Sequence, residues 1–311
     1  MTSSSAITKC RVGGGGMARG VACSHKPETR AGLEIPKQYM RFNQSQGVIS
    51  LASILYFLGN GCGVPSAFAG RPLTVDDAEP VGVRQMEFET GVSYAKSANL
   101  NHCDLPFALT YGLFERAEIG LGFGAHYAEW DAETGQDDKV DGVGDLTVGT
   151  KIKWLSADRF WADQALALTL KPPTASYHKG FGSGEMDIDA AWILSKTLGK
   201  RWTAHGNVAY TWTGNRSNEA FDDVLRYGLA LDYALTDRAQ WVMEAFALTP
   251  LSKEDNTAIA LNGGLRWKVS DSVVLDAALG TGARRDPVDI RATVGITWTF
   301  DFTPRASENL K

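Results

Sequence analysis

Residues 289–300, D-I-R-A-T-V-G-I-T-W-T-F, alternate between two kinds of side chain along their whole length. One set is apolar and ends in two aromatic rings: Ile290, Ala292, Val294, Ile296, Trp298 and Phe300. The other set is small, polar or charged: Arg291, Thr293, Gly295, Thr297 and Thr299. Because successive side chains of a β-strand point to opposite faces, this period of two predicts a strand with one apolar face and one polar face. Such a strand suits a wall that separates lipid from water.

Eleven further segments repeat this alternation, at 84–96, 105–113, 119–127, 145–154, 161–171, 186–196, 202–213, 225–235, 239–247, 258–269 and 272–280. Links after the even-numbered strands are short, and links after the odd-numbered strands are mostly longer, with 129–143 and 172–185 the longest. Short turns at one rim and long loops at the other are typical of an outer-membrane barrel with both termini in the periplasm. We therefore predict an all-β fold, a transmembrane antiparallel up-and-down β-barrel of about 12 strands over residues 84–300.

Aromatic residues gather at both ends of the predicted strands. One group falls near the short turns: Trp154, Trp161, Trp202, Trp241, Trp267 and Trp298. A second group falls near the long loops: Tyr94, Tyr127, Trp130, Tyr210 and Trp212. Amphipathic rings settle at membrane interfaces, so two girdles favour a membrane barrel over a soluble one.

An apolar stretch within 47–58 lies near the N-terminus and is too short to span a membrane as a helix. Lys37 and Arg41 precede it and Pro65-Ser66-Ala67-Phe68-Ala69 follows it. Basic residues, a short apolar core and an A-x-A site predict a secretory signal peptide over 40–69, cleaved after Ala69. Residues 1–39 are predicted to be an unstructured extension or an upstream mis-start, with Met40 as the alternative first residue.

Two shorter segments flank the predicted barrel. Residues 70–83 show no regular period and are interpreted as a periplasmic tether or as a segment inside the lumen. Residues 301–311 are predicted to form a C-terminal tail.

Charge and cysteine content narrow the functional classes. Residues 1–69 hold seven of the 31 Lys and Arg and two of the 36 Asp and Glu, which leaves a formal net charge of −10 for residues 70–311. That balance argues against nucleic acid as a partner. Cys103 is the one cysteine after Ala69, so an intramolecular disulfide, a thiolate metal cluster and a catalytic dithiol are not expected. Cys103 is assigned to a loop.

The polar strand faces are predicted to line the lumen. Twelve strands enclose more space than these side chains could fill as a dry core, whereas a Lys or Arg facing lipid would cost about 2–4 kcal/mol at mid-depth. The lumen-lining candidates are Glu87, Glu89, His126, Lys151, Lys153, Asp187, Asp189, His205, Arg226, Asp232, Glu244, Arg266, Lys268, Asp276 and Arg291. They could form a salt-bridge network that plugs the barrel, a constriction that selects permeants, or both at once.

Several motifs occur in order along nearly all of the chain after Ala69: 70–78, 109–120, 142–154, 179–184, 227–238, 269–282 and the closing strand. On these the chain resembles the meta-pathway phenol-degradation family of outer-membrane barrels, whose members are often called transporters. The resemblance implies a barrel that passes small molecules, with aromatic or otherwise hydrophobic compounds as one candidate class. Members usually end at the terminal aromatic, and this chain continues for eleven residues past Phe300.

Enzymatic and metal sites are weaker hypotheses. An outer-membrane hydrolase would need a Ser–His pair on the lipid-facing surface. His126 and His205 fall instead on the inward face, and His102 and His178 are assigned to loops. Residues 137–142 faintly match a calcium loop, but Lys139 stands where a ligand is needed and position twelve is Val148. A solvated acidic loop is predicted there, with no metal and no cofactor.

The preferred hypothesis is a monomeric channel in the bacterial outer membrane, surrounded by lipid, for passive uptake of a small-molecule permeant. A closed structural or surface-recognition barrel is the first alternative, and a lipid-modifying enzyme is the second.

Overall fold

The computed structural model describes residues 70–98, 100–131, 137–215, 221–252 and 257–303. The predicted signal peptide, the extension before it and the tail from residue 304 lie outside these residues. Within the described chain, no helix is long and apolar enough to cross a membrane.

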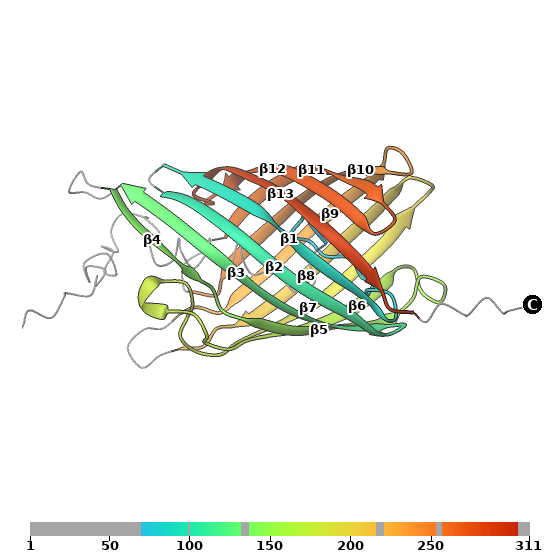
Figure 1. Cartoon of the computed structure of the whole chain (residues 1–311), viewed down its shortest axis with the longest axis horizontal. Helices are drawn as coiled ribbons and strands as arrows, with labels where there is room; N and C mark the ends of the chain where they lie inside the picture. The colour runs from blue at the N-terminus through green and yellow to red at the C-terminus, as the bar shows by residue number, and fades with distance from the viewer. Residues whose placement is uncertain (1–69, 99, 132–136, 216–220, 253–256, 304–311) are drawn as a thin grey trace, which may run out of the picture. The chain divides into compact units, whose positions relative to one another are not determined.

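The described chain is built from thirteen antiparallel strands (Figure 1). Their bounds are β1 Gln85–Ser97, β2 Leu100–Phe114, β3 Ala117–Asp131, β4 Asp137–Val143, β5 Thr147–Leu155, β6 Asp163–Lys171, β7 Asp187–Leu198, β8 Trp202–Trp212, β9 Val224–Ala234, β10 Ala239–Pro250, β11 Ala258–Ser270, β12 Val273–Arg284 and β13 Val288–Asp301. A single turn of 3-10 helix, η2 Tyr177–Lys179, lies in the link before β7.

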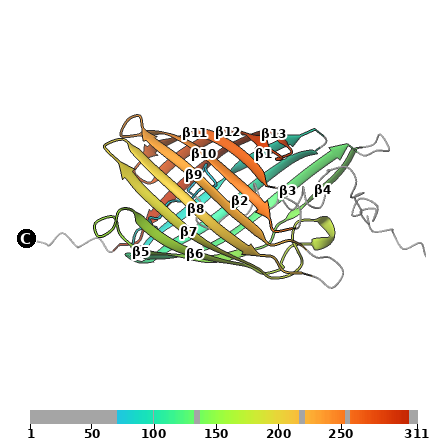
Figure 2. The same cartoon turned by 180° about the vertical axis from the view of Figure 1, so that it is seen from behind.

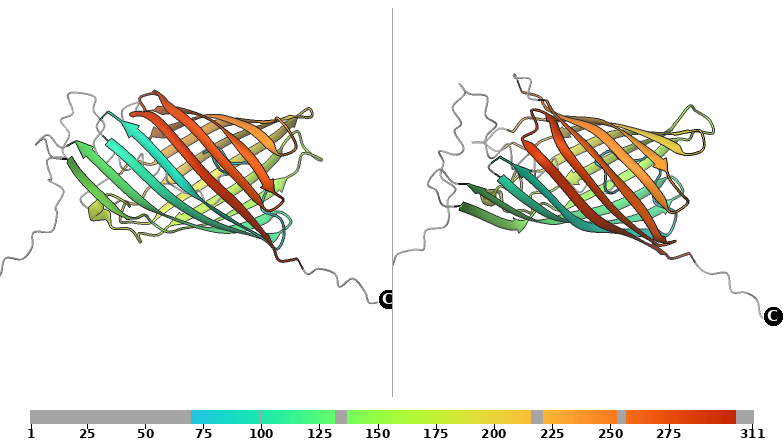
Figure 3. Two further views of the ribbon diagram at one scale, coloured as in Figure 1. Left: turned by 45° about the horizontal axis from the view of Figure 1, so that its top comes forward. Right: turned by 90° about the horizontal axis from the view of Figure 1, so that it is seen from above.

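Twelve of these strands form a closed ring in which each strand pairs with its neighbours in the chain. The ring closes where β1 pairs with β13, from Gln85 opposite Asp301 to Ser97 opposite Val288. The view from behind and the two turned views show the same continuous wall of tilted strands (Figures 2 and 3). The predicted fold class is therefore confirmed, and Asp289–Phe300 is the strand that closes the barrel.

The extra strand, β4, replaces most of a predicted loop. The first part of β3, residues 117–122, pairs with β5, beginning with Ala117 opposite Ile152. The second part of β3, residues 125–131, pairs with β4, beginning with Ala125 opposite Val143. The prediction of a solvated acidic loop at 137–142 was wrong, because these residues satisfy their backbone in a ladder with β3. β4 itself pairs with β3 alone among the described strands.

The start of β2 also differs from the sequence prediction. His102 and Cys103 were assigned to loops, yet both lie in β2, opposite Ala95 and Tyr94 of β1. The backbone hydrogen bonds with β1 begin at Leu100, before the residues from 105 onward that alternate between apolar and polar. Polar side chains are tolerated there because one face of the strand looks into the lumen.

The distribution of apolar side chains is the reverse of a soluble barrel. Leu109 and Phe123 are 38% and 46% exposed on the outer surface, whereas Asp104 and Glu118 are 3% and 1% exposed inside. Strands therefore turn apolar faces outward and polar faces inward. We call the rim with the tight turns the short-turn rim and the opposite rim the long-loop rim.

Candidate channel lumen

Residues 70–83 run inside the barrel and contact strands on every side of it. Glu244, near the middle of β10, makes the densest attachment. Its carboxylate accepts hydrogen bonds from the backbone N–H of Thr74 at 2.8 and 2.9 Å and from that of Val75 at 2.8 Å. The side-chain amide of Asn262 donates a further bond at 2.6 Å. These bonds attach the segment to inward-facing side chains of the strands.

Two more backbone N–H groups of the segment are bound by side chains of other strands. Ala78 donates to the Ser195 hydroxyl of β7 at 2.8 Å. Val81 donates to Glu118 of β3 at 2.5 Å. A segment without regular secondary structure thus satisfies its backbone through the barrel wall, as buried backbone groups require.

Ion pairs supplement these bonds. The Arg71 guanidinium lies 3.3 Å from Asp276 of β12 and donates to the Thr293 hydroxyl at 2.9 Å. Lys151 of β5 lies 3.4 Å from both Asp76 and Glu118. Lys153 pairs with Glu79 and lies 3.1 Å from Asp163.

The carbonyl groups at the start of the segment are bound by Arg266 of β11. Its guanidinium donates to the carbonyl oxygens of Arg71 at 2.6 Å and Gly70 at 2.7 Å, and to Asp232 at 2.6 Å. Arg266 therefore joins the segment to the wall between β9 and β11.

Apolar contacts complete the docking. Leu73 and Val75 pack into a buried cluster with Val242 and Phe246 of β10, and Ala78 packs against Ala165 and Ile193. Glycines make room for the segment. A Cβ added at Gly295 would lie 2.3 Å from Arg71 Nε, and one at Gly228 would lie 2.7 Å from Val75 Cγ2.

Asp76 is the buried acid of the segment. Burial raises the pKa of the Asp76 carboxyl to about 7, and the Lys151 ammonium opposes that rise without cancelling it.

The outer part of the lumen holds a second set of charges. Lys171 lies 2.6 Å from Asp187, Arg226 lies 3.2 Å from Asp189, and Arg291 lies 2.6 Å from Asp286 in the loop before β13. The Arg291 guanidinium also sits 5.8 Å from the centre of the Phe246 ring. These contacts involve no residue of 70–83.

Three of the remaining lumen-lining candidates, Glu87, Glu89 and Lys268, contact other residues of the strands and turns. Glu87 and Glu89 each accept a bond of 3.3 Å from a β13 hydroxyl, Thr299 and Thr297 respectively. Lys268 pairs with Asp271 in the turn at 2.9 Å with 46% of its side chain exposed, so it lies at the short-turn rim and not among the lumen contacts.

Several residues of the lumen network were missed by sequence reasoning. Glu118, Asp104 and Ser195 stand on the polar faces of their strands, so alternation could have found them. Arg71 and Asp76 could not have been found, because residues 70–83 carry no period that fixes a side chain.

A Ser–His–Asp arrangement also occurs on the inner face. His205 Nδ1 lies 2.8 Å from Ser195 Oγ, and His205 Nε2 lies 3.7 Å from Asp232. Ser195 Oγ is buried under Ala78 and accepts its N–H, and Asp232 is bound by Arg266. This hydroxyl acts as a docking group for the segment.

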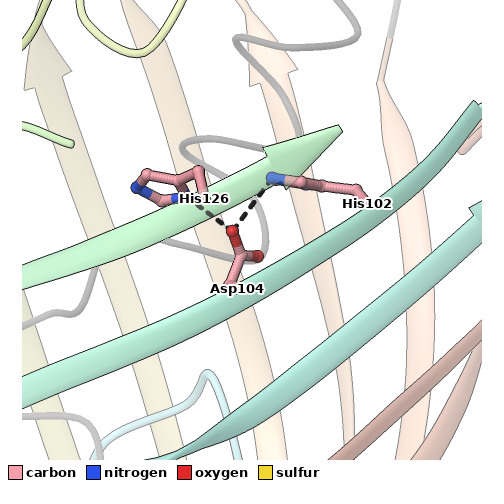
Figure 4. Close-up of side chains that lie close together, drawn as sticks. All are labelled: His102, Asp104 and His126. Atoms are coloured by element: carbon pink, nitrogen blue, oxygen red, sulfur yellow. Dashed lines mark hydrogen bonds and ion pairs between the residues drawn. The ribbon is translucent and has the colours of Figure 1, made fainter. Parts of the chain in front are cut away.

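His102, Asp104 and His126 form a separate buried cluster near the long-loop rim (Figure 4). His126 Nδ1 lies 2.5 Å from Asp104 Oδ1, and His102 Nε2 lies 2.9 Å from the same oxygen. The two imidazole rings face each other with centroids 5.9 Å apart.

Comparison with known proteins now identifies the class. Residues 73–300 match the family described as "Putative MetA-pathway of phenol degradation", and the chain belongs to this family. No curated protein matches the chain.

Two solved structures share the fold. The COG4313 outer membrane channel from Pseudomonas putida F1 superposes with a TM-score of 0.61 at 14% identity, covering 72% of this chain and 98% of that one. The NanC porin superposes with a TM-score of 0.51 at 9% identity, covering 68% and 98%. The resemblance stated from the sequence is therefore confirmed.

Proposed function

We propose that the protein is an outer-membrane channel for passive uptake of small molecules. The observation that carries this proposal is the way the lumen is filled. The inner half is occupied by residues 70–83, which are joined to the wall by hydrogen bonds, ion pairs and packing and not by a strand ladder. A segment held in this way can leave the lumen, or shift within it, while the ring of strands stays intact.

The proposal also covers the processing of the chain, its place in the membrane and its oligomeric state. The signal peptide is cleaved after Ala69, residues 84–300 form the membrane barrel, and lipid surrounds its exposed apolar face. The protein works as a monomer. Transport, not catalysis, is the role proposed for the lumen; the Ser195 hydroxyl, which lies beside His205, accepts the N–H of Ala78 in the docked segment.

Aromatic or otherwise hydrophobic small molecules are the proposed permeants. Support for this class comes from the family description, which refers to phenol degradation. The lumen candidates Asp187, Asp189, Arg226 and Arg291 would be met first from the long-loop rim, and Lys151 and Glu244 deeper inside.

Electrical conductance in planar bilayers tests the proposal, together with uptake of a labelled aromatic acid into liposomes. The wild-type protein is expected to show small, fluctuating conductance, and a variant lacking residues 70–83 is expected to show a larger, steadier one. Both variants must run as heat-modifiable, folded barrels on gels. Silence of both, or equal conductance of both, would contradict the proposal.

A closed structural or surface-recognition barrel is the second candidate, favoured by the pairing of the lumen charges. The same experiment separates it from the channel. A closed barrel would stay silent in the wild type under every voltage and permeant tried, even if the shortened variant conducts.

A further inference from the structure

We propose that His102, Asp104 and His126 form a binding site for a divalent transition-metal cation of the zinc class, in the outer part of the lumen. The sequence alone predicts no metal site here, because His102 was assigned to a loop. The inference does not depend on the channel function.

The strand ladder, and not a mobile loop, brings the three side chains together. His102 and Asp104 stand two residues apart on β2 and therefore on the same face. His126 is the cross-strand partner of Asp104 in the β2–β3 ladder. A site built on paired strands is preorganised, since neither backbone needs to move for the ligand atoms to meet.

The chemistry of the donor set suits a transition metal. Two imidazole nitrogens and one carboxylate oxygen lie within 4.8 Å of one another, and the three residues are 2%, 3% and 8% exposed. Imidazole suits zinc, copper and nickel, whereas magnesium and calcium prefer sites made only of oxygen. Three protein ligands leave one tetrahedral position of a zinc ion open.

A second observation is the hydrogen bonding of His102. Neither ring nitrogen of His102 has a hydrogen-bond partner within the described part of the chain. Nε2 lies 2.9 Å from Asp104 Oδ1, a contact that is an ion pair only when the ring is protonated. A buried neutral imidazole without a hydrogen-bond partner is unfavourable, and a cation bound by Nε2 and the carboxylate would give Nε2 a partner in the neutral state.

The distances need only a small adjustment. Metal–ligand bonds of about 2.0–2.2 Å in tetrahedral geometry place ligand atoms about 3.4 Å apart. The present separations of 2.5 and 2.9 Å must therefore open by less than about 1 Å. Side-chain rotation can supply this without a change in the ladder.

The neighbours shape one side of the site. The Phe181 ring stacks on His126 with centroids 5.5 Å apart, and a Cβ added at Gly144 would lie 2.4 Å from His126 Nε2. A bound cation would join β2 to the part of β3 that has left the ladder with β5 and pairs with β4. It would add a cross-link to the β2–β3 ladder at that point.

Untagged protein purified from outer membranes provides the test after it is stripped with chelator, reloaded with Zn²⁺ and dialysed to remove the excess. We expect one equivalent of Zn²⁺ by elemental analysis, and Co²⁺ loaded in its place should give the visible bands of a four-coordinate site that Ca²⁺ does not displace. His102→Ala and His126→Ala should each weaken binding by at least about 100-fold, since even outer-shell partners are worth 10–100-fold. His205→Ala is the matched control, because it removes a lumen histidine outside the cluster, and it should bind normally.

Two results would overturn the proposal. One is no saturable Zn²⁺ or Co²⁺ binding by the wild type, and the other is unchanged binding by a folded His102→Ala/His126→Ala double variant. If the double variant does not fold, pulsed electron paramagnetic resonance of the Cu²⁺-loaded wild type decides. Two coordinated imidazoles support the site, and one or none refutes it.

Discussion

Replacement of Glu244 by Gln should loosen residues 70–83 without disturbing the barrel wall. The carboxylate receives the N–H groups of Thr74 and Val75 and the Asn262 amide. Gln keeps the shape of the side chain, but one acceptor oxygen becomes an NH₂ donor that faces other donors. A hydrogen bond to a charged group contributes about 1.5–3 kcal/mol, so the docked state should lose about 3 kcal/mol. Because about 1.4 kcal/mol changes an equilibrium constant tenfold, the undocked population should rise about 100-fold.

Thiol labelling measures that population directly. Val75 is buried in the docked segment, so a Val75→Cys variant in a Cys103→Ser background reacts with a soluble maleimide when the segment leaves. When docking is fast relative to labelling, the labelling rate follows the undocked fraction. Adding Glu244→Gln should raise the rate about 100-fold at fixed pH.

The matched control is Asp189→Asn, which breaks contacts with Arg226 and Thr211 in the outer lumen and touches no residue of 70–83. Its labelling rate should equal that of the parent. If Glu244→Gln stays within about threefold of the parent, the carboxylate is not what holds the segment, and the estimate built on charged hydrogen bonds fails.

Three further outcomes are expected. Burial raises the pKa of Asp76 in the docked segment to about 7, so between the ordinary pKa of an aspartate and about 7 the docked segment binds a proton that the undocked one lacks, and docking weakens as pH rises through 7. Bilayer conductance should therefore be higher at pH 8 than at pH 5, and Asp76→Asn should reduce the difference. Deletion of 304–311 should leave a heat-modifiable barrel, whereas deletion of 301–311 removes the Asp301–Gln85 pairing and the 3.0 Å bond from Phe302 N to Arg84 O and should lower the folded fraction on gels. Leu109→Arg on the outer face should cost about 2–4 kcal/mol in vesicle unfolding titrations, and more than Leu109→Ala; equal costs would argue against lipid contact.

The wall was predictable because its signal is local. Each strand carries its own period of two, so the predicted 289–300 and 202–213 agree closely with β13 and β8. The predicted strand bounds were wrong where the backbone hydrogen bonds between strands extend beyond the residues that alternate between apolar and polar. β2 begins at Leu100 and not 105, because β1 supplies its hydrogen-bond partners, and β4 exists because the outer part of β3 offers an edge.

The lumen was predictable only in part. Alternation placed charges such as Glu244 and Lys151 on the polar face, but it could not say what they meet. Several of their partners belong to residues 70–83. Asp76 lies 75 positions from Lys151 along the chain, and Thr74 lies 170 positions from Glu244. Contacts of that kind depend on where a segment without a period comes to rest, which only the assembled barrel determines.

The carboxylates of the inner wall that bind residues 70–83 have a physical reason to be there. A twelve-strand ring lined by residues as small as Gly91, Gly228 and Gly295 cannot close its own lumen. A chain segment can fill it, but an irregular segment brings backbone N–H groups that need acceptors. Glu244 and Glu118 supply such acceptors. Water can replace an N–H at a carboxylate more readily than it can replace packed apolar surface, so polar attachment suits the exit and return of the segment that we propose.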